Sequence, residues 1–322
     1  MRRPTQSFGR RRGGFGGLGG RLPILLLGLA GLAFYWFSNQ QTVPFSDRKQ
    51  LITIPIEQAS QMGLQSYAQI LQQEGSNVLC LPGGQCPQGA PEVVDKVREI
   101  GERLERAAIE LEDELLAEGY KFQPVARDFD WQYNVILSEQ PNAFCLPGGY
   151  VAVYTQIMDV AGDNNGSFQP SLDLADVDKL AVIMGHEIGH ALAHHGAERM
   201  SQQKIAQIGQ TAIGLGAGGG VEGRAILQAF GMAAQGGILK FSREHETEAD
   251  KIGLDLLVRA CYDPREAPEL WERMGQLGGG ERPPEWMSTH PASETRAENF
   301  RRWMPEAVAY YEQNCSGSRS GF

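Results

Sequence analysis

The chain lacks several patterns that would point directly to a function. None of its five cysteines forms the close C-x-x-C pair of a structural zinc site, and no glycine-rich loop ends in the Lys-Ser/Thr of a phosphate-binding loop. No internal repeat is present. Basic residues are concentrated in residues 1–21, which hold six arginines and no acid; because these contribute +6 to a net charge of −10, the rest carries −16. Nucleic acid requires a basic face, so we expect no nucleic-acid partner.

Long apolar runs are also scarce, and the run at residues 22–37 stands out. Its sixteen uncharged residues would span about 24 Å as a helix, a little less than a bilayer core of roughly 30 Å. No small-x-small cleavage site follows it, which favours an uncleaved anchor over a signal peptide. The glycine-rich tract at residues 13–20 is a poor amphipathic helix, which argues against a mitochondrial presequence. We therefore predict a disordered basic tail (1–21) and a transmembrane signal anchor (22–37). The body would face the periplasm of a bacterial inner membrane, with the mitochondrial inner membrane as the alternative.

The cysteines agree with such an oxidising compartment. Cys80 and Cys86 flank a short, flexible loop that a disulfide could close, and Cys261 and Cys315 could form a second pair. Cys145 would be left over. The alternative, that all five are ordinary thiols, stays open at this stage.

Periodicity predicts an α+β fold that is mainly helical. We divide the body into a linker and N-terminal extension (38–90) and a main domain (91–322). A short strand is expected at 51–56, followed by a helix to about Glu74, and a long amphipathic helix begins at Pro91. Alternation predicts a strand at 131–137, and a Pro-Gly-Gly turn predicts a hairpin or bulged strand within 141–154.

The segment 184–195 contains His-Glu-x-x-His on a predicted helix. Positions four apart share one helix face, so His186 and His190 can bind one metal ion. Glu187, one step round, is placed to take a proton from a water that the metal makes acidic. Apolar residues surround much of this helix, which predicts that it is buried. A buried polar face needs partners, and this favours a metal.

A zinc hydrolase needs a third protein ligand, and residues 241–254 supply it. Glu246 and Asp250 are four apart, hence on one face of a helix. We assign Glu246 to the metal and Asp250 to a hydrogen bond with a ligating imidazole. Glu248 points elsewhere and is expected in solvent. Glu244 and His245 are competing ligands.

The metzincin pattern is excluded at two positions. Ala193 stands where that pattern needs glycine, and Gly196 stands where it needs a third histidine. We therefore expect His194 and His195 at the surface or behind the ligands.

One more histidine lies in the segment Ser288–Pro291. A histidine held in a proline-bounded turn could donate to the oxyanion of the reaction or occupy the fourth metal position, so His290 has two candidate roles. A surface histidine before a helix is the plain alternative. Arg296, six residues further on, is expected to help shape the same turn.

The combination of His186-Glu187-Ile188-Gly189-His190 with Glu246-Thr247-Glu248-Ala249-Asp250 resembles a family of membrane-associated zinc metallopeptidases. This gluzincin family includes HtpX, BepA, the mitochondrial Oma protease and the CAAX prenyl endopeptidases. Residues 142–149 and 288–291 are similar to segments of the BepA/Oma branch. The resemblance covers roughly residues 90–305, and it implies a zincin domain with a small sheet, one Zn²⁺ per chain, and His186, His190 and Glu246 as ligands.

The same resemblance implies a function. Glu187 would be the catalytic acid/base, and the substrates would be unfolded, misfolded or misassembled envelope proteins. We expect substrate backbone to pair with the strand near Gly149, Tyr150 and Val151, a binding mode with little sequence preference. The alternative is a membrane-bound chaperone or assembly factor with a purely structural zinc. Because no repeat period follows Trp303, we expect neither the helical repeat domain of BepA-like members nor the multiple spans of HtpX. The oligomeric state is not predicted.

Overall fold

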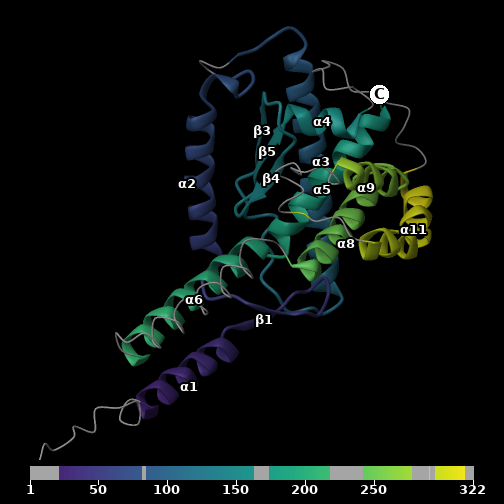
Figure 1. Ribbon diagram of the computed structural model, residues 1–322. Coiled ribbons are helices and arrows are strands. Elements are labelled where there is room, and N and C mark those ends of the chain that lie inside the picture. The colour runs from purple at the N-terminus through teal and green to yellow at the C-terminus, as the bar shows by residue number, and fades with distance from the viewer. Residues whose placement is uncertain are drawn as a thin grey trace, which may run out of the picture. The chain divides into compact units, whose positions relative to one another are not determined.

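The computed structural model describes residues 22–81, 85–162, 174–217, 242–277, 290 and 294–315 (Figure 1). The chain divides into two compact units, one of residues 1–39 and 203–235 and the other of residues 40–202 and 236–322. The larger unit is mainly helical with a small sheet, as the sequence predicts. The predicted basic tail lies outside the described residues.

The apolar run forms helix α1 (Leu22–Ser38), as predicted. Large apolar side chains are exposed along it, among them Leu27, Phe34 and Phe37. Within the described residues, no helix combines the length and the apolar character needed to cross a membrane.

The main sheet has three strands in the order β3-β5-β4. Strand β3 (Gln132–Ile136) runs parallel to β5 (Tyr150–Tyr154), whereas β4 (Ala143–Leu146) runs antiparallel to β5. The predicted hairpin is therefore confirmed. The turn between β4 and β5 contains Gly148 and Gly149 at φ +99° and +87°, a conformation that residues with a Cβ rarely adopt.

Helices cover both faces of this sheet (Figure 1). Alternate residues of β5 point to opposite sides: Tyr150 and Ala152 pack with Tyr67 of α2 (Ile56–Glu74), and Val151 and Val153 join the main core. On that second side lies α3 (Ala90–Ala117), the amphipathic helix predicted from Pro91. The helices expected near Glu74 and Pro91 are both confirmed.

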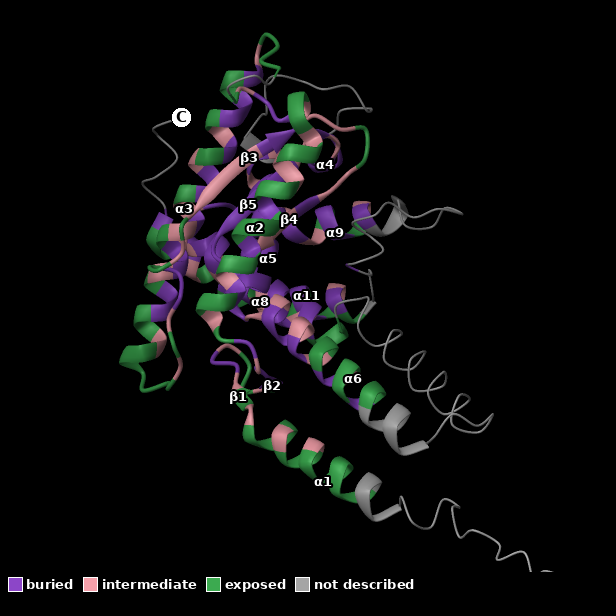
Figure 2. Ribbon diagram, turned by 90° about the vertical axis from the view of Figure 1, so that its left-hand side faces the viewer, coloured by how far each residue is buried: buried purple, intermediate pink, exposed green. Residues whose placement is uncertain are grey.

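Helix α5 (Leu174–Leu192), which carries the His-Glu-x-x-His pattern, is buried along most of its described length (Figure 2). It packs closely against α8 (Arg243–Arg259). Glycines permit this approach, because a Cβ on Gly189 would lie 2.9 Å from the carbonyl oxygen of Ala249, and one on Gly253 would lie 2.9 Å from the backbone nitrogen of His186. The two helices that carry the predicted ligands therefore meet backbone to backbone.

The segment before α2 differs from its prediction. Strands β1 (Gln40–Thr42) and β2 (Lys49–Leu51) form a hairpin, so a strand ends at Leu51, where one was expected to begin. Val43 is fully buried and belongs to the main core together with Leu79. Residues 40–90, which the sequence assigns to a linker and an N-terminal extension, belong to the same compact unit as α5 and α8.

Both predicted disulfides are present. Cys80 pairs with Cys86, and Cys261 pairs with Cys315 at the end of α11 (Glu294–Cys315), while Cys145 on β4 is a free thiol. The remaining described elements are the 3-10 turn η2 (Gly75–Asn77) and the helices α4 (Thr155–Ala161), α6 (His195–Ala217) and α9 (Glu266–Leu277).

Candidate metal centre

Helix α5 brings two imidazoles to one buried point. His186 and His190 are one turn apart, and their Nε2 atoms are 3.1 Å apart. Their exposed fractions are 1% and 3%, so water does not surround them. The sequence prediction that both rings point to one position agrees with this geometry.

The first turn of α8 supplies the carboxylate. Its N-cap Ser242 accepts a hydrogen bond from the backbone N–H of His245, whose side chain accepts one from the backbone N–H of Ser242. This cap fixes the start of the helix, and Glu246 follows at once. The carboxylate oxygens of Glu246 lie 3.5 Å from Nε2 of His186 and 3.5 Å from Nε2 of His190.

These spacings match what one zinc ion requires. Two donors held about 2.0–2.1 Å from an ion and separated by a tetrahedral angle are about 3.3 Å apart. The two imidazole nitrogens observed here are 3.1 Å apart, and each lies 3.5 Å from one of the two carboxylate oxygens of Glu246. Nitrogen and oxygen donors of this kind are usual zinc ligands. The residues therefore fit a zinc ion.

His290 completes the group. Its Nδ1 lies 3.3 Å from Nε2 of His186 and 3.1 Å from Oε1 of Glu246, while its Nε2 lies 3.7 Å from Oε1 of Glu187. Donor atoms of His186, His190, Glu246 and His290 all lie within 4.8 Å of one another. Of its two predicted roles, the position of His290 favours the fourth ligand. Its neighbours Ser288, Thr289 and Pro291 lie outside the described residues.

Asp250 lies behind His186, as the sequence predicts. Its Oδ1 is 3.0 Å from Nδ1 of His186, and Arg296 grips both of its oxygens at 2.7 Å. The buried guanidinium of Arg296 also reaches Glu246 at 2.9 Å and stacks 3.7 Å above the ring of Trp271. Arg296, which was expected to help shape the turn of His290, thus contacts the site directly, and the rest of that turn lies outside the described residues.

The charges around His186 favour a cation. Burial alone would lower the pKa of His186, but hydrogen bonds to Asp250 and Glu246 and their negative charges outweigh it and raise this pKa to about 9. The same two carboxylates would stabilise a metal ion at the Nε2 side of the ring.

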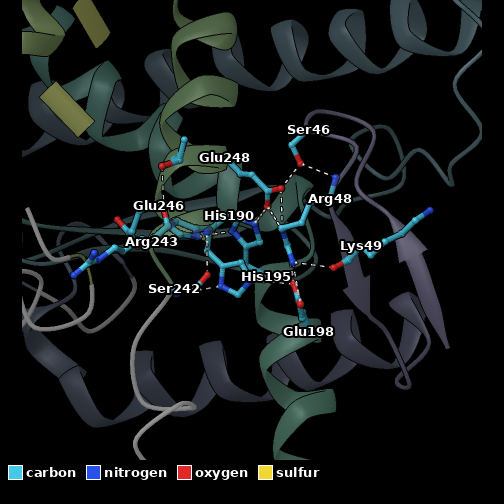
Figure 3. Close-up of polar contacts among 12 residues, drawn as sticks. Ser46, Arg48, Lys49, His190, His195, Glu198, Ser242, Arg243, Glu246 and Glu248 are labelled. Atoms are coloured by element: carbon cyan, nitrogen blue, oxygen red, sulfur yellow. Dashed lines mark hydrogen bonds and ion pairs between the residues drawn. The ribbon is translucent and has the colours of Figure 1, made fainter. Parts of the chain in front are cut away.

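A second buried network lies behind His190 (Figure 3). Nδ1 of His190 is 2.7 Å from Nδ1 of His195, whose Nε2 is 2.8 Å from Oε2 of Glu248. Arg48 holds Glu248 from the other side at 2.9 Å. The prediction that Glu248 is in solvent is wrong, since its side chain is only 5% exposed. His195 is fully buried, which agrees with a place behind the ligands and not with the surface.

A cleft of about 250 Å³ opens beside the donors. Glu187, His190 and His290 line one part of it, and residues of β4 line another. The rest is mostly apolar, with contributions from Ile56, Ala59, Phe129, Leu146, Pro147, Ala191 and Ala197. The cleft therefore places an extended apolar surface next to the candidate acid/base.

The predicted substrate strand requires a correction. Tyr150 and Val151 pair with β3 on one side and with β4 on the other, so β5 has no free edge for a substrate, and Gly149 accepts from the backbone N–H of Gln132. The strand that borders α5 and the cleft is β4. Sequence reasoning missed this because periodicity does not reveal that β5 lies between β4 and the earlier strand β3.

Sequence reasoning also missed Arg48 and Glu198. Arg48 was assigned to a linker, and its carboxylate partners are 150 and 200 positions away. Periodicity reports only which face of a local element is apolar, so it carries no signal for such a contact.

Comparison with known proteins agrees with this geometry. The model of peptidase family M48 matches residues 106–304. The mitochondrial metalloendopeptidase OMA1 of Saccharomyces cerevisiae is 29% identical over 307 residues, which cover 92% of this chain and 79% of that protein. Its counterpart in Schizosaccharomyces pombe is 30% identical over 285 residues, 87% of this chain and 71% of that protein.

A bacterial relative matches a shorter part. The β-barrel assembly-enhancing protease of Escherichia coli is 29% identical over 179 residues, which cover 53% of this chain and 34% of that protein. The predicted resemblance to the BepA/Oma branch is thus confirmed. A family match that spans both α5 and α8, together with a buried set of metal donors, shows that the chain is a metalloendopeptidase that belongs to peptidase family M48.

Proposed function

We propose that the protein is a zinc-dependent endopeptidase that hydrolyses unfolded or misassembled proteins at a membrane. The observation that carries the proposal is the set of four donors within 4.8 Å of one another, next to Glu187 and open to a cleft. The metal of this family is usually zinc, and the donor spacing supports zinc bound by His186, His190 and Glu246.

Zinc, when bound, would act as a Lewis acid toward a carbonyl and would lower the pKa of a water molecule. We assign the proton transfers to Glu187. This side chain is 3% exposed and lines the cleft with His190, so its carboxylate can take a proton from the attacking water and return it to the leaving amine. Asp250 orients His186, and Arg296 holds Asp250 in place.

We further propose that His290 closes the fourth ligand position in the resting protein. Catalytic zinc sites keep one position open, so a substrate would enter when His290 moves away. The variant His290→Ala should then hydrolyse peptides faster than the wild type. A loss of activity would instead support the alternative in which His290 donates to the oxyanion.

Substrate backbone is proposed to add beside β4. This strand is at an edge of the sheet and borders the cleft, and its residues 143–146 line it. Edge pairing recognises extended chain through main-chain hydrogen bonds, and the apolar lining would take side chains that a folded protein buries. Both features favour unfolded or misfolded substrates.

The membrane association is also a proposal. Exposed apolar side chains on α1, preceded by the basic residues 1–21, support an anchor. A bacterial inner membrane with the catalytic unit in the periplasm agrees with the two disulfides, and the mitochondrial inner membrane is the alternative. Two relatives are named as mitochondrial, and another is named for β-barrel assembly, which supports envelope proteins as substrates.

One observation favours a second function. Structural zinc sites have four protein ligands, and His290 supplies a fourth donor here. A membrane-bound chaperone or assembly factor with the same zinc site is therefore the alternative. It gives no role to the buried Glu187 in the cleft.

The variant Glu187→Gln separates the two functions. It keeps the volume of the side chain but cannot accept a proton, so zinc content should stay at one ion per chain while cleavage of unfolded casein is lost. Casein cleavage at the wild-type rate would contradict the endopeptidase proposal. A protein purified without bound zinc, and unable to take it up, would contradict the assigned ligands.

A further inference from the structure

Arg48 joins two buried carboxylates behind the candidate metal centre (Figure 3). It lies between β1 and β2. Its Nε is 2.9 Å and 3.0 Å from the two oxygens of Glu248, and its Nη1 and Nη2 are 3.0 Å and 2.8 Å from those of Glu198. Both carboxylate side chains are 5% exposed. One planar guanidinium therefore serves two carboxylates that would otherwise repel each other in a region with little water.

Each carboxylate in turn contacts one histidine. Nε2 of His195 is 2.8 Å from Glu248, and Nε2 of His245 is 3.0 Å from Glu198. The two imidazole rings stack with their centroids 4.3 Å apart. Two positively charged rings would repel at this distance, so the stack disfavours charge on both rings. Nδ1 of His245 accepts the backbone N–H of Ser242, so the hydrogen of this ring is on Nε2, where Glu198 accepts it.

The positions of the hydrogens follow from these contacts. An ionised carboxylate only accepts hydrogen bonds, so Nε2 of His195 carries the hydrogen that Glu248 accepts. Nδ1 of a neutral His195 is then an acceptor, and Nδ1 of His190, 2.7 Å away, must donate. This leaves Nε2 of His190 with its lone pair directed at the group of donors, 3.5 Å from Glu246.

The arrangement parallels the one on the other ligand. Asp250 contacts Nδ1 of His186 directly, and Arg296 grips Asp250 with two bonds of 2.7 Å. On the His190 side, His195 lies between the candidate ligand and the carboxylate of Glu248. Arg48 binds Glu248 there as Arg296 binds Asp250 on the His186 side. Both candidate imidazole ligands thus have a buried carboxylate–arginine pair behind them.

We propose that Arg48 is a positioning residue for the metal centre. Through Glu248 and His195, it holds His190 in the tautomer and orientation that a metal needs. Without the guanidinium, Glu248 and Glu198 would turn away from each other, and His195 would lose its anchor. The inference rests on the ligand set proposed above, and it gives the segment between α1 and α2 a function in metal binding.

The test compares the full-length variants Arg48→Met and Arg259→Met. Arg259 is a matched control, because it is also largely buried, at 12% exposed against 16%, and also bridges two carboxylates, Glu110 and Glu114. Zinc affinity is measured by competition with a chelator, and the visible spectrum of the cobalt-substituted protein reports the ligand geometry. Loss of a residue that orients a ligand typically weakens metal binding by about 10–100-fold.

We expect Arg48→Met to bind zinc about tenfold more weakly and to change the cobalt spectrum, and Arg259→Met to do neither. Two further variants apply if Arg48→Met does not fold. Arg48→Lys should recover part of the affinity, since lysine keeps the charge but cannot bond both carboxylates as a fork, and Glu248→Gln should weaken zinc as Arg48→Met does.

Three results would overturn the inference: wild-type zinc affinity in Arg48→Met, equal losses in Arg48→Met and Arg259→Met, or wild-type affinity in Glu248→Gln. These results are distinct from a failure of the proposed function. If the wild-type protein binds no zinc, or if His190→Ala binds it as tightly as wild type, the ligand set itself is wrong.

Discussion

The contact between α5 and α8 gives a sharp prediction for Gly189→Ala. Both helices carry metal donors, and they meet at Gly189 and Ala249. A Cβ on Gly189 would lie 2.9 Å from the carbonyl oxygen of Ala249, 3.2 Å from its Cα and 3.4 Å from its carbonyl carbon. These atoms are backbone, so they cannot rotate away as a side chain would. The variant must push the two helices apart or strain them.

The expected magnitudes follow from two opposing effects. Overpacking typically costs about 1–3 kcal/mol, whereas replacing a helical glycine by alanine gains about 1 kcal/mol in helix propensity. The net loss in the free energy of unfolding is therefore small, about 0–2 kcal/mol. Metal binding is less tolerant, because metal–ligand distances are fixed within about 0.2 Å. Moving Glu246 away from His190 by a few tenths of an ångström should weaken zinc by about tenfold, or about 1.4 kcal/mol.

The assay measures zinc affinity and thermal unfolding, with and without a chelator, in three variants. Gly185→Ala is a graded comparison, since its Cβ would lie 3.2 Å from the carbonyl oxygen of Gly253. Gly31→Ala in α1 is the control, because nothing lies within 4 Å of its added Cβ. We expect the order of zinc loss Gly189, Gly185, Gly31. Wild-type zinc affinity in Gly189→Ala, or a greater loss in Gly185→Ala, would refute the reasoning.

Three further predictions concern a pH dependence, a disulfide and a ligand partner. Burial outweighs the backbone hydrogen bonds from Val125 and Ala126 and raises the pKa of Glu112 from 4.5 to about 7. Between pH 4.5 and 7 the folded protein holds a proton that the unfolded chain has released. The free energy of unfolding is therefore highest at low pH and falls by up to about 3 kcal/mol as the pH rises through 7. Glu112→Gln should flatten this pH dependence in urea unfolding. The disulfide of Cys261 closes a loop of 54 residues, and the disulfide of Cys80 closes one of 6. The loss of chain entropy in the unfolded state then stabilises the fold by about 4 and about 2 kcal/mol, respectively. Cys261→Ser should therefore lower the unfolding midpoint about twice as much as Cys80→Ser, and equal shifts would contradict this. Asp250→Asn should weaken zinc by about 10–100-fold in chelator competition, and unchanged affinity would exclude its role behind His186.

The candidate ligands could be predicted from sequence because their relation is local. His186 and His190 share a helix face by their spacing alone, and so do Glu246 and Asp250. The inference that the two helices share one site followed because a zinc hydrolase needs a third protein ligand. The structure brings all four residues together, with Asp250 behind His186 at 3.0 Å.

The contacts behind the candidate ligands could not be predicted from the sequence, and Glu248 shows why. It is two residues from Glu246, so it points to the opposite side of α8, which a single helix considered alone would leave in solvent. The β1–β2 hairpin covers that side and brings Arg48 to it from 200 positions away. The substrate edge was mistaken for a similar reason. A hairpin of β4 and β5 leaves two free edges, and the edge on β5 is closed only because β5 also pairs with the earlier strand β3.

The first turn of α8 thus contacts two parts of the chain, one on each of its opposite faces. Glu246 faces the metal donors, and Glu248 faces Arg48 and the hairpin that precedes α2. His195 connects Glu248 back to His190, so a chain of hydrogen bonds runs from the hairpin to one of the metal donors. Thermodynamic linkage is reciprocal. If the packed hairpin increases the affinity for zinc, bound zinc stabilises the packed hairpin by the same free energy. The β1–β2 hairpin, which the sequence marks only as a connection to α1, is then energetically coupled to metal binding at the site.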